Sequence, residues 1–355
     1  MRGSLLLCAA AALCALQQAS ARHRLEPPDG RLLHAGGQEP GCFESYSAFL
    51  GARGPAVKMA YAGLEGLNGT APGAVPAFFT ALASALAADA APDGAFIALQ
   101  LGLQLPLNGQ EARVAAGEYD AAIEALRAGL VALQRPVWLR IGYEFNGQWN
   151  NYAPASFVGA FRRVAAALRA DALLNQTVAL VWDGSCDTRT DPTPFWPGAD
   201  VVDWQGINLF SAGSSPASAS QRGSCPWYWL QDSLQAGLPL MVGESTPRGL
   251  NTSDPATLGA WHAPYAALLQ GAPNLKLFSY IDQDWEVAEG GRWRGWGEAR
   301  VEVAAPALQA QWRALLGRPA LVNRAQRSAL LAVLGLPENV FEADAAQRAA
   351  AGRSS

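Results

Sequence analysis

The chain has 355 residues, of which half are hydrophobic and 16% are charged, and its formal net charge is −4. A chain of this size can bury a large core, and barrels of alternating strands and helices commonly form a single domain at about this length. It carries no basic cluster of the kind that binds nucleic acids or anionic membranes, so we expect neither as a partner.

The first 21 residues have the order of a secretory signal peptide. A basic start precedes an apolar run over residues 5–16, and Ala19-Ser20-Ala21 follows as a cleavage site. The run is too short for a stable membrane-spanning helix. We therefore expect a secreted chain that begins near Arg22. Three N-glycosylation sequons agree with export, and they begin at Asn68, Asn175 and Asn251.

Eight short apolar runs of strand length follow in chain order. They lie at 32–35, 57–61, 96–101, 137–141, 178–182, 201–207, 240–243 and 275–280. Segments with helical spacing separate most of them, as over 118–133, 155–170 and 254–270, whereas the link after the fifth run is short and rich in proline. Alternating strands and helices predict a parallel sheet, and eight repeats favour a closed (β/α)8 barrel over an open sheet.

We assign residues 22–318 to this barrel. Residues 319–355 form an Ala-rich extension without a strand-like run. We expect a short helix over 323–334 and a frayed end over 345–355.

Three cysteines, Cys42, Cys186 and Cys225, remain after the expected cleavage. An odd number in a secreted protein indicates one disulfide and one free thiol. Cys186 and Cys225 fall in loops expected to be neighbours, so we expect them to pair. The alternative is that all three are buried free thiols.

The fourth run points to a catalytic carboxylate. Side chains alternate along a strand, so Val137, Leu139 and Ile141 should face the helices, while Arg140, Gly142 and Glu144 face the barrel axis. Glu144 would then stand at the mouth, where barrel enzymes carry their sites. A buried carboxylate needs a partner or a function, and Arg140 is the nearest candidate partner. The alternative is a purely structural Arg–Glu pair.

The seventh run repeats the arrangement, because Leu240-Met241-Val242-Gly243 leads directly into Glu244. Alternation places Glu244 on the same face as Val242. Strands four and seven lie on opposite sides of an eight-stranded ring. Two carboxylates facing each other across its mouth are typical of retaining glycoside hydrolysis, in which they stand about 5–5.5 Å apart.

Aromatic residues support a sugar site, because rigid indole rings pack well on the C–H faces of pyranoses. Eight tryptophans fall at or after the expected strand ends: Trp149, Trp182, Trp196, Trp227, Trp229, Trp285, Trp293 and Trp296. We expect about half of them to be structural. Asn146 and Asn208 are the amide candidates for sugar hydroxyls. The three histidines lack metal-ligand spacing, and no phosphate loop or Gly-x-Ser-x-Gly elbow occurs, so we expect no metal or cofactor.

At this point the residues resemble a known family. Tyr143-Glu144-Phe145-Asn146-Gly147-x-Trp149, followed by Tyr152-x-Pro154 and Phe161-Arg162, resembles the acid/base segment of glycoside hydrolase family 26. Residues 242–247 resemble its nucleophile strand, and the resemblance extends from about Leu32 to Leu316. It implies a retaining β-glycanase, such as a β-mannanase, with Glu144 as acid/base and Glu244 as nucleophile.

The resemblance also implies that Asn146, Trp149 and Trp285 contact the sugar, and we add Trp182 as a candidate contact. The chain departs from the family at two places. Tyr143 stands where the mannanases usually have histidine, and Phe210 stands near a tyrosine that supports the nucleophile in many clan members. We therefore expect Tyr280 or Asn208 to give that support, and we count both among the candidate substrate contacts. Mannan specificity is left open.

Our first hypothesis is a monomeric endo-acting enzyme that hydrolyses a β-linked polysaccharide. Two alternatives use the same barrel: a sugar-binding protein without turnover, and a transglycosylase. Turnover of an oligosaccharide separates the first alternative, and product analysis with excess sugar acceptor separates the second.

Overall fold

A computed structural model describes residues 22–39, 41–71, 73–210 and 215–351, and the expected signal peptide over residues 1–21 lies outside these ranges. Eight parallel strands form a closed ring in the order β1 to β8, because β1 pairs with both β2 and β8. The predicted (β/α)8 barrel is therefore confirmed. Its strands are β1 (Leu32–Gly37), β2 (Val57–Gly63), β3 (Ala98–Gln104), β4 (Val137–Ile141), β5 (Val178–Ser185), β6 (Trp204–Leu209), β7 (Leu240–Ser245) and β8 (Leu275–Tyr280).

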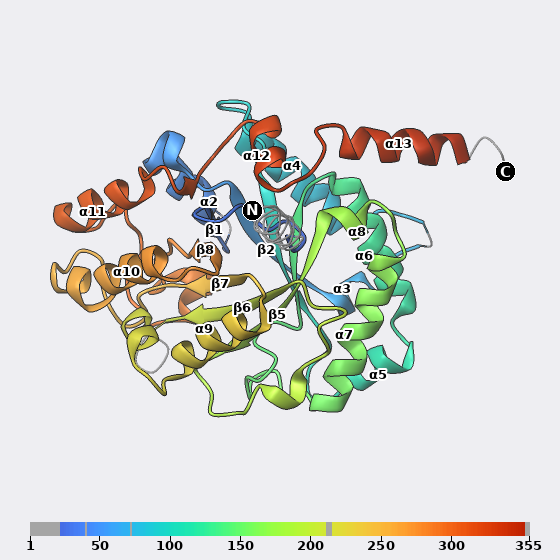
Figure 1. The fold of residues 1–355 in the computed structure, drawn as a ribbon, viewed down its shortest axis with the longest axis horizontal. Coiled ribbons are helices and arrows are strands. Elements are labelled where there is room, and N and C mark those ends of the chain that lie inside the picture. Colours follow the sequence, from blue (N-terminus) through green and yellow to red (C-terminus); the bar gives the residue numbers. More distant parts are fainter. Residues whose placement is uncertain (1–21, 40, 72, 211–214, 352–355) are drawn as a thin grey trace, which may run out of the picture.

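Helices surround this ring (Figure 1). The longer ones are α2 (Cys42–Leu50), α4 (Ala77–Ala90), α6 (Asp120–Leu133), α7 (Pro154–Arg169), α9 (Cys225–Ala236), α10 (Ala263–Gly271) and α11 (Pro306–Leu316), and the shorter ones are α3 (Leu64–Leu67), α5 (Glu111–Ala116) and α8 (Leu174–Thr177). None of the helices in the described ranges is long and apolar enough to cross a membrane.

The predicted helices occur close to their expected positions. The expected helix over 118–133 is α6, and the one over 155–170 is α7, which has Pro154 in its first turn. The third expected helix, over 254–270, is capped by Asp254, which accepts a hydrogen bond from the Ala256 amide. It passes through a π-helical turn at Leu258–His262 into α10. The proline-rich link after β5 holds only a short 3-10 turn, Thr193–Phe195.

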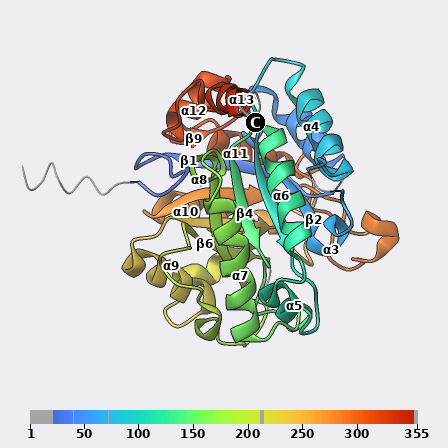
Figure 2. The ribbon, with the colours of Figure 1, turned by 90° about the vertical axis from the view of Figure 1, so that its right-hand side faces the viewer.

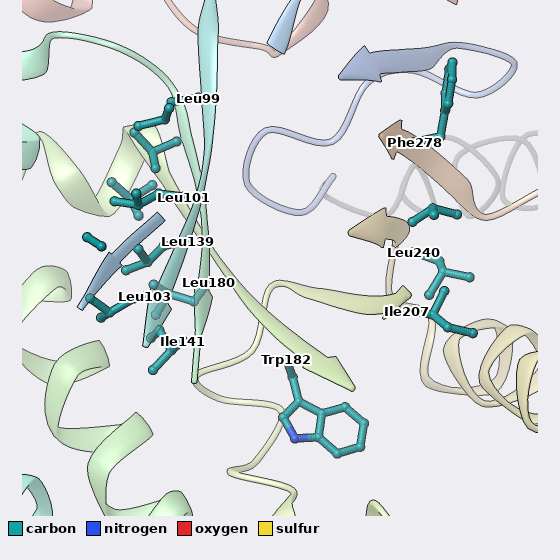
Figure 3. Close-up of a cluster of buried hydrophobic side chains, with 14 of the residues drawn as sticks. Leu99, Leu101, Leu103, Leu139, Ile141, Leu180, Trp182, Ile207, Leu240 and Phe278 are labelled. Atoms are coloured by element: carbon teal, nitrogen blue, oxygen red, sulfur yellow. The ribbon is translucent and has the colours of Figure 1, made fainter. Parts of the chain in front are cut away.

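Two apolar layers result from the alternation of side chains along the strands. The outer layer joins strands to helices, and Figure 3 shows part of it, including Leu139, Ile141 and Ile207. The inner layer fills the lower part of the barrel and includes Trp138 and Met241. The barrel is thus packed below its mouth, and the inward positions above this apolar layer include polar residues such as Gln100, Arg140 and Asp183.

The C-terminal extension differs from the prediction. Leu321 and Val322 form a two-residue strand, β9, that pairs with the start of β1, whereas we had expected no strand there. The expected helix over 323–334 is α12 (Arg327–Val333). Over 345–351 the structure has a helix, α13 (Val340–Ala351), in place of the expected frayed end, and residues 352–355 lie outside the described residues. Both helices lie together at the top of Figures 1 and 2.

The extension is ordered because it covers the floor of the barrel. Leu330, Leu331 and Phe341 are buried in the same cluster as the inward residues of the strands. The few large apolar residues of this Ala-rich segment show no clear helical or strand spacing, so the sequence did not indicate that the extension contacts the strands. The extension therefore contributes to the barrel's core through these buried side chains.

Candidate active site

Glu144 lies in a tight turn beyond the end of β4. Gly142 and Glu144 both have a positive φ, of 58° and 53°, which a glutamate seldom adopts. The turn is fixed by three hydrogen bonds: the Glu144 amide donates to the Asp183 carbonyl at 2.8 Å, and Asn150 Nδ2 donates to the carbonyls of Tyr143 and Glu144 at 2.9 and 3.0 Å. Strain that is held in this way is common at functional sites.

Glu244 reaches the barrel mouth by a route that simple alternation does not predict. Val242 packs outward with the helices, whereas Gly243 and Glu244 both lie toward Arg140. The register of β6 and β7 shifts at this point, so that Asn208 pairs with Glu244. The prediction that Val242 and Glu244 share a face is therefore wrong, because a bulge changes the alternation of side chains.

One arginine joins the groups at the mouth. Arg140 Nη2 donates to Glu244 Oε1 at 2.7 Å, and Arg140 Nε donates to Asp183 Oδ2 at 2.5 Å. No hydrogen bond joins Arg140 to Glu144, so its expected partner was wrong. Glu144 Oε1 instead accepts from Asn208 Nδ2 at 3.0 Å, and Asn208 Oδ1 accepts from Arg140 Nη2 at 3.3 Å. Asn208 thus connects the two glutamates through a chain of hydrogen bonds.

The two glutamates have different electrostatic surroundings. Burial raises the pKa of Glu144 to about 8, and the negative charge of Glu244 adds to the increase. Glu244 has the guanidinium of Arg140 directly against it. One carboxyl is therefore held protonated at neutral pH beside another that has a cationic partner, which is the division that acid/base and nucleophile roles require.

Two tyrosines complete the wall of the site. The Tyr143 ring lies 5.1 Å from the Arg140 guanidinium, and it meets the Tyr61 ring edge to face with centroids 5.2 Å apart. Tyr61 Oη accepts from Arg140 Nη1 at 3.4 Å. Burial, followed by the charge of Glu244, raises the pKa of both hydroxyls, so they remain protonated donors.

Asn146 is committed to the backbone, although we had expected it to contact sugar. Its Nδ2 donates to the carbonyls of Ser185 and Thr190, and its Oδ1 accepts from the Ser185 amide at 2.8 Å. Its amide is used inside the protein, and it ties the Glu144 turn to the end of β5.

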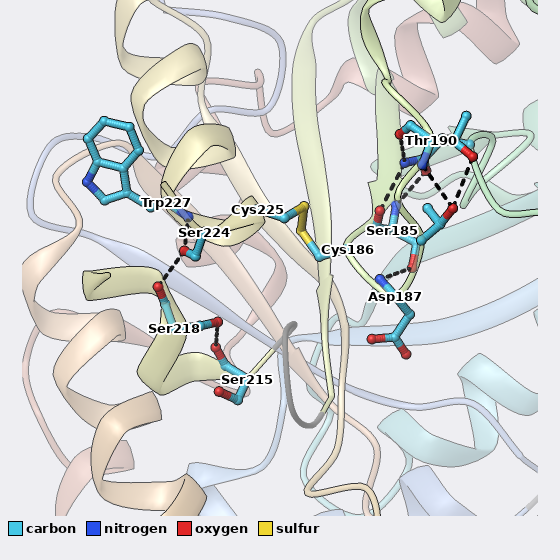
Figure 4. The surroundings of a disulfide bond; sticks show 11 residues. Ser185, Cys186, Asp187, Thr190, Ser215, Ser218, Ser224, Cys225 and Trp227 are labelled. Carbon is cyan, nitrogen blue, oxygen red and sulfur yellow. Dashed lines mark hydrogen bonds between the residues drawn. A yellow bond between two sulfur atoms is a disulfide. The ribbon is translucent and has the colours of Figure 1, made fainter. Parts of the chain in front are cut away.

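The disulfide between Cys186 and Cys225 is confirmed, and Cys42 is a buried free thiol. The bond joins the segment after β5 to the first residue of α9 (Figure 4). Cys186 directly follows Ser185, whose backbone holds Asn146. The disulfide therefore braces the segment on which the Glu144 turn rests.

The candidate aromatic contacts separate by exposure. Trp149 is 44% exposed, and its ring covers Gly147, where a Cβ would collide with it. Trp182 is buried, and its Nε1 donates to the Phe195 carbonyl. Trp285 is also buried, and its Nε1 donates to Thr246, two residues past Glu244. Of the three, Trp149 alone presents a large free ring surface.

Tyr280 lies away from the carboxylates. It is fully buried, and its hydroxyl donates to the Ala299 carbonyl at 2.7 Å. Of the two residues expected to support the nucleophile, Asn208 is therefore the one at the site, and it bonds to Glu144 instead of Glu244. The direct support of Glu244 comes from Arg140.

Sequence reasoning missed Asp183 and Tyr61. Asp183 is the next inward position after Val181, so extending the fifth run by one residue would have placed it at the mouth. Tyr61 ends the second run and has the same parity as Val57, which points into the barrel. Among the residues that the structure describes, no three histidine, cysteine or acidic side chains are grouped to hold a metal ion.

The closed barrel and its two glutamates, joined by Arg140 and Asn208 at the strand ends, define a barrel of the glycoside hydrolase class. No family model matches the chain. A β-1,3-xylanase from Alcaligenes sp. is 29% identical over 356 aligned residues, which cover 91% of this chain and 70% of that protein. The β-1,3-xylanase TXYA from Vibrio sp. is 27% identical, and the alignment covers 91% of this chain and 72% of that protein.

Solved structures agree with the fold. A family 26 β-mannanase from Bacteroides ovatus has a TM-score of 0.55 at 14% identity and covers 83% of this chain and 90% of that one. An endo-β-1,4-mannanase from Cellulomonas fimi has a TM-score of 0.58 at 16% identity and covers 83% and 72%. The chain is thus similar to β-glycanases and shares its fold with mannanases of glycoside hydrolase family 26, which agrees with the resemblance of its two glutamate segments to that family.

Proposed function

We propose that this protein is a retaining endo-β-glycosidase that hydrolyses a β-linked polysaccharide. The observation that carries the proposal is the pair of glutamates at the ends of β4 and β7, which Asn208 and Arg140 link and whose surroundings differ in charge. Relatives that share more than a quarter of its residues are named as xylanases, which supports an endo-acting glycanase.

The reaction would proceed in two displacements. The Glu244 carboxylate attacks the anomeric carbon, and the bond from that carbon to the leaving oxygen breaks. Glu144 gives its proton to that oxygen, so the leaving sugar departs as an alcohol. Glu144 then takes a proton from water, whose oxygen attacks the anomeric carbon and releases Glu244.

The substrate we propose is a β-1,3-linked xylan, with β-1,4-mannan as the second candidate. The two relatives that match most of the chain are named β-1,3-xylanases, whereas the likeness to mannanases is one of fold at 14–16% identity. Tyr143, in place of the histidine usual in mannanases, agrees with a different specificity. Hydrolysis of β-1,3-xylan, β-1,4-xylan and β-1,4-mannan, compared at equal sugar concentration, tests this choice.

The two glutamate roles are tested with Glu244→Gln and Glu144→Gln. Loss of the nucleophile should reduce kcat by at least about 10⁴-fold, because no covalent intermediate can form. Glu124→Gln, a surface glutamate paired with Arg127, is the control and should leave kcat unchanged. Equal activity of Glu244→Gln and wild type would refute the mechanism, as would proton NMR of fresh product that shows an inverted anomeric centre.

Secretion and glycosylation are part of the proposal. A disulfide persists best in an oxidising compartment, which agrees with the signal-like segment over residues 1–21. Asn68 is exposed, whereas Asn175 is half-buried and its side chain and carbonyl accept hydrogen bonds from Arg24. We therefore expect a glycan at Asn68 and none at Asn175, which peptide mapping of the secreted protein would test together with an N-terminus near Arg22.

A further inference from the structure

Asp183 is a fully buried acid that the reaction described above does not use. It lies near the end of β5, in the same layer as Arg140 and Glu244. Its Oδ2 binds Arg140, and its Oδ1 has no hydrogen-bond partner. A charge buried with half of its hydrogen-bonding capacity unused is costly, and a neutral side chain would fill the same space more cheaply.

Two positions that face Asp183 have room only for glycine. A Cβ on Gly206 would lie 2.5 Å from Asp183 Oδ1, and one on Gly243 would lie 3.0 Å from the same atom and 2.9 Å from Arg140 Nε. The next two strands of the barrel, β6 and β7, therefore lack side chains at the level of this ion pair. Asp183 and Arg140 together fill the centre of the barrel just below the two glutamates.

Asp183 sets how Arg140 points. A guanidinium is planar and its donors form a fixed fork, so one bond to Nε determines where the other nitrogens lie. Asp183 Oδ2 lies against both Nε and Nη2, Nη2 also meets Glu244 and Asn208, and Nη1 approaches Tyr61. Without Asp183, the fork would be free to turn, and Glu244 would lose its fixed partner.

We propose that Asp183 is a positioning residue: it fixes the Arg140 fork and offsets its charge, so that Glu244 is aimed while Glu144 stays protonated. The inference rests on the proposed glycosidase function. The net charge of the site supports the inference. The single cation, Arg140, faces the carboxylates of Asp183 and Glu244, so a third carboxyl group nearby, that of Glu144, favours its neutral form. The titratable and charged groups around Asp183 are Tyr61, Arg140, Tyr143, Glu144 and Glu244.

The test is Asp183→Asn, which keeps the shape and removes the charge. We expect kcat to fall by roughly 10- to 100-fold with KM close to wild type, because the nucleophile is misaimed and remote sugar contacts are kept. The alkaline limb of the pH profile should move to lower pH, since the charge of Asp183 helps to raise the pKa of Glu144. The substitution creates Asn-Gly-Ser, so the protein must come from a host that does not glycosylate.

Asp203→Asn is the matched control. Asp203 is also buried and pairs with Arg24 and Arg169, but it precedes β6 at the opposite end of the barrel. The Asp203→Asn substitution should lower the Tm and leave the pH profile of kcat unchanged. If Asp183→Asn does the same, so that only stability changes, Asp183 is merely structural and the inference is overturned.

A measurement without substrate separates this inference from the proposed function. Carboxyl ¹³C NMR of glutamate-labelled protein, with Glu144 assigned through Glu144→Gln, reports its titration directly. A lower Glu144 pKa in Asp183→Asn supports the inference even if no polysaccharide is cleaved, in which case the function alone fails. Asp183→Ser replaces the first variant if that does not fold. If the NMR titration of the wild type gave Glu144 a pKa near the ordinary glutamate value of 4.5, the inference would be overturned without any variant.

Discussion

At the scale of single residues, Glu144 makes the activity depend on pH. Burial and the charge of Glu244 raise the pKa of Glu144 to about 8, and the first displacement needs its proton. We therefore expect kcat/KM to fall about tenfold per pH unit above pH 8. The measurement is a pH profile on polysaccharide. In Glu144→Gln, an aryl glycoside whose leaving group needs no proton should show no such limb, and a limb that survived there would have to be assigned to another group.

The same shift has a consequence for stability. An unfolded Glu144 loses its proton near the ordinary glutamate pKa of 4.5, whereas the folded one keeps it to about 8, so folding becomes less favourable as pH rises between these values. The cost is absent below about pH 4 and complete above pH 8. Because the group is partly exposed, we expect Glu144→Gln to stabilise the protein by about 1–2 kcal/mol at pH 9.

Urea unfolding of wild type and Glu144→Gln at pH 4 and pH 9 measures this effect. The two proteins should unfold alike at pH 4. A difference that is the same at both values would show that the substitution acts through packing and not through the proton.

Residue identity explains why the sequence revealed the two glutamates and concealed their partners. Glu244 directly follows an apolar run and Glu144 comes three residues after the end of one, which makes both conspicuous. Asp183 lies next to Trp182 in a strand that continues past its apolar part, and its importance depends on Arg140 from a neighbouring strand. Local sequence does not record such a contact between strands, so the choice of Glu144 as the partner of Arg140 was wrong.

At the scale of elements, alternation predicted most inward and outward faces and failed at one bulge. In β4 the outward row of Val137, Leu139 and Ile141 and the inward Arg140 lie as predicted. Just past the strand the alternation ends, and a Cβ on Gly142 would point at Phe157 of the helix layer and not at the barrel axis. Between β6 and β7 the register shifts, and Val242 and Glu244 lie on different faces. Bulges depend on the pairing of two strands, so one strand's pattern cannot place them.

The disulfide is the element-scale link that can be tested alone. It closes a loop of 39 residues, and its loss frees the segment after β5 from α9. We expect Cys186→Ser with Cys225→Ser to lower the free energy of unfolding by about 2–4 kcal/mol. Because Ser185 holds Asn146, kcat should fall as well. Cys42→Ser, at the free thiol, is the control. Because it keeps the disulfide, reductant should destabilise Cys42→Ser and the wild type equally.

At the scale of the whole molecule, eight repeats of strand and helix made the barrel predictable, because each repeat carries its own periodicity. The floor was not predictable. Leu331 and Phe341 reach it from an Ala-rich segment after the last repeat, where no spacing points to the strands. Closure of a barrel at its base depends on whichever segment returns there, which is a property of the whole chain.

This closure leads to a prediction about how the molecule unfolds. Leu331 is fully buried against the inward strand residues, so Leu331→Ala should leave a cavity and cost about 2–5 kcal/mol. Leu234, which is 42% exposed on α9, is the matched control, and Leu234→Ala should change stability by less than about 0.5 kcal/mol. Calorimetry decides whether the extension and barrel unfold together. A single transition shifted to lower temperature shows one cooperative unit, whereas an early separate transition would show that α12 and α13 detach from an intact barrel.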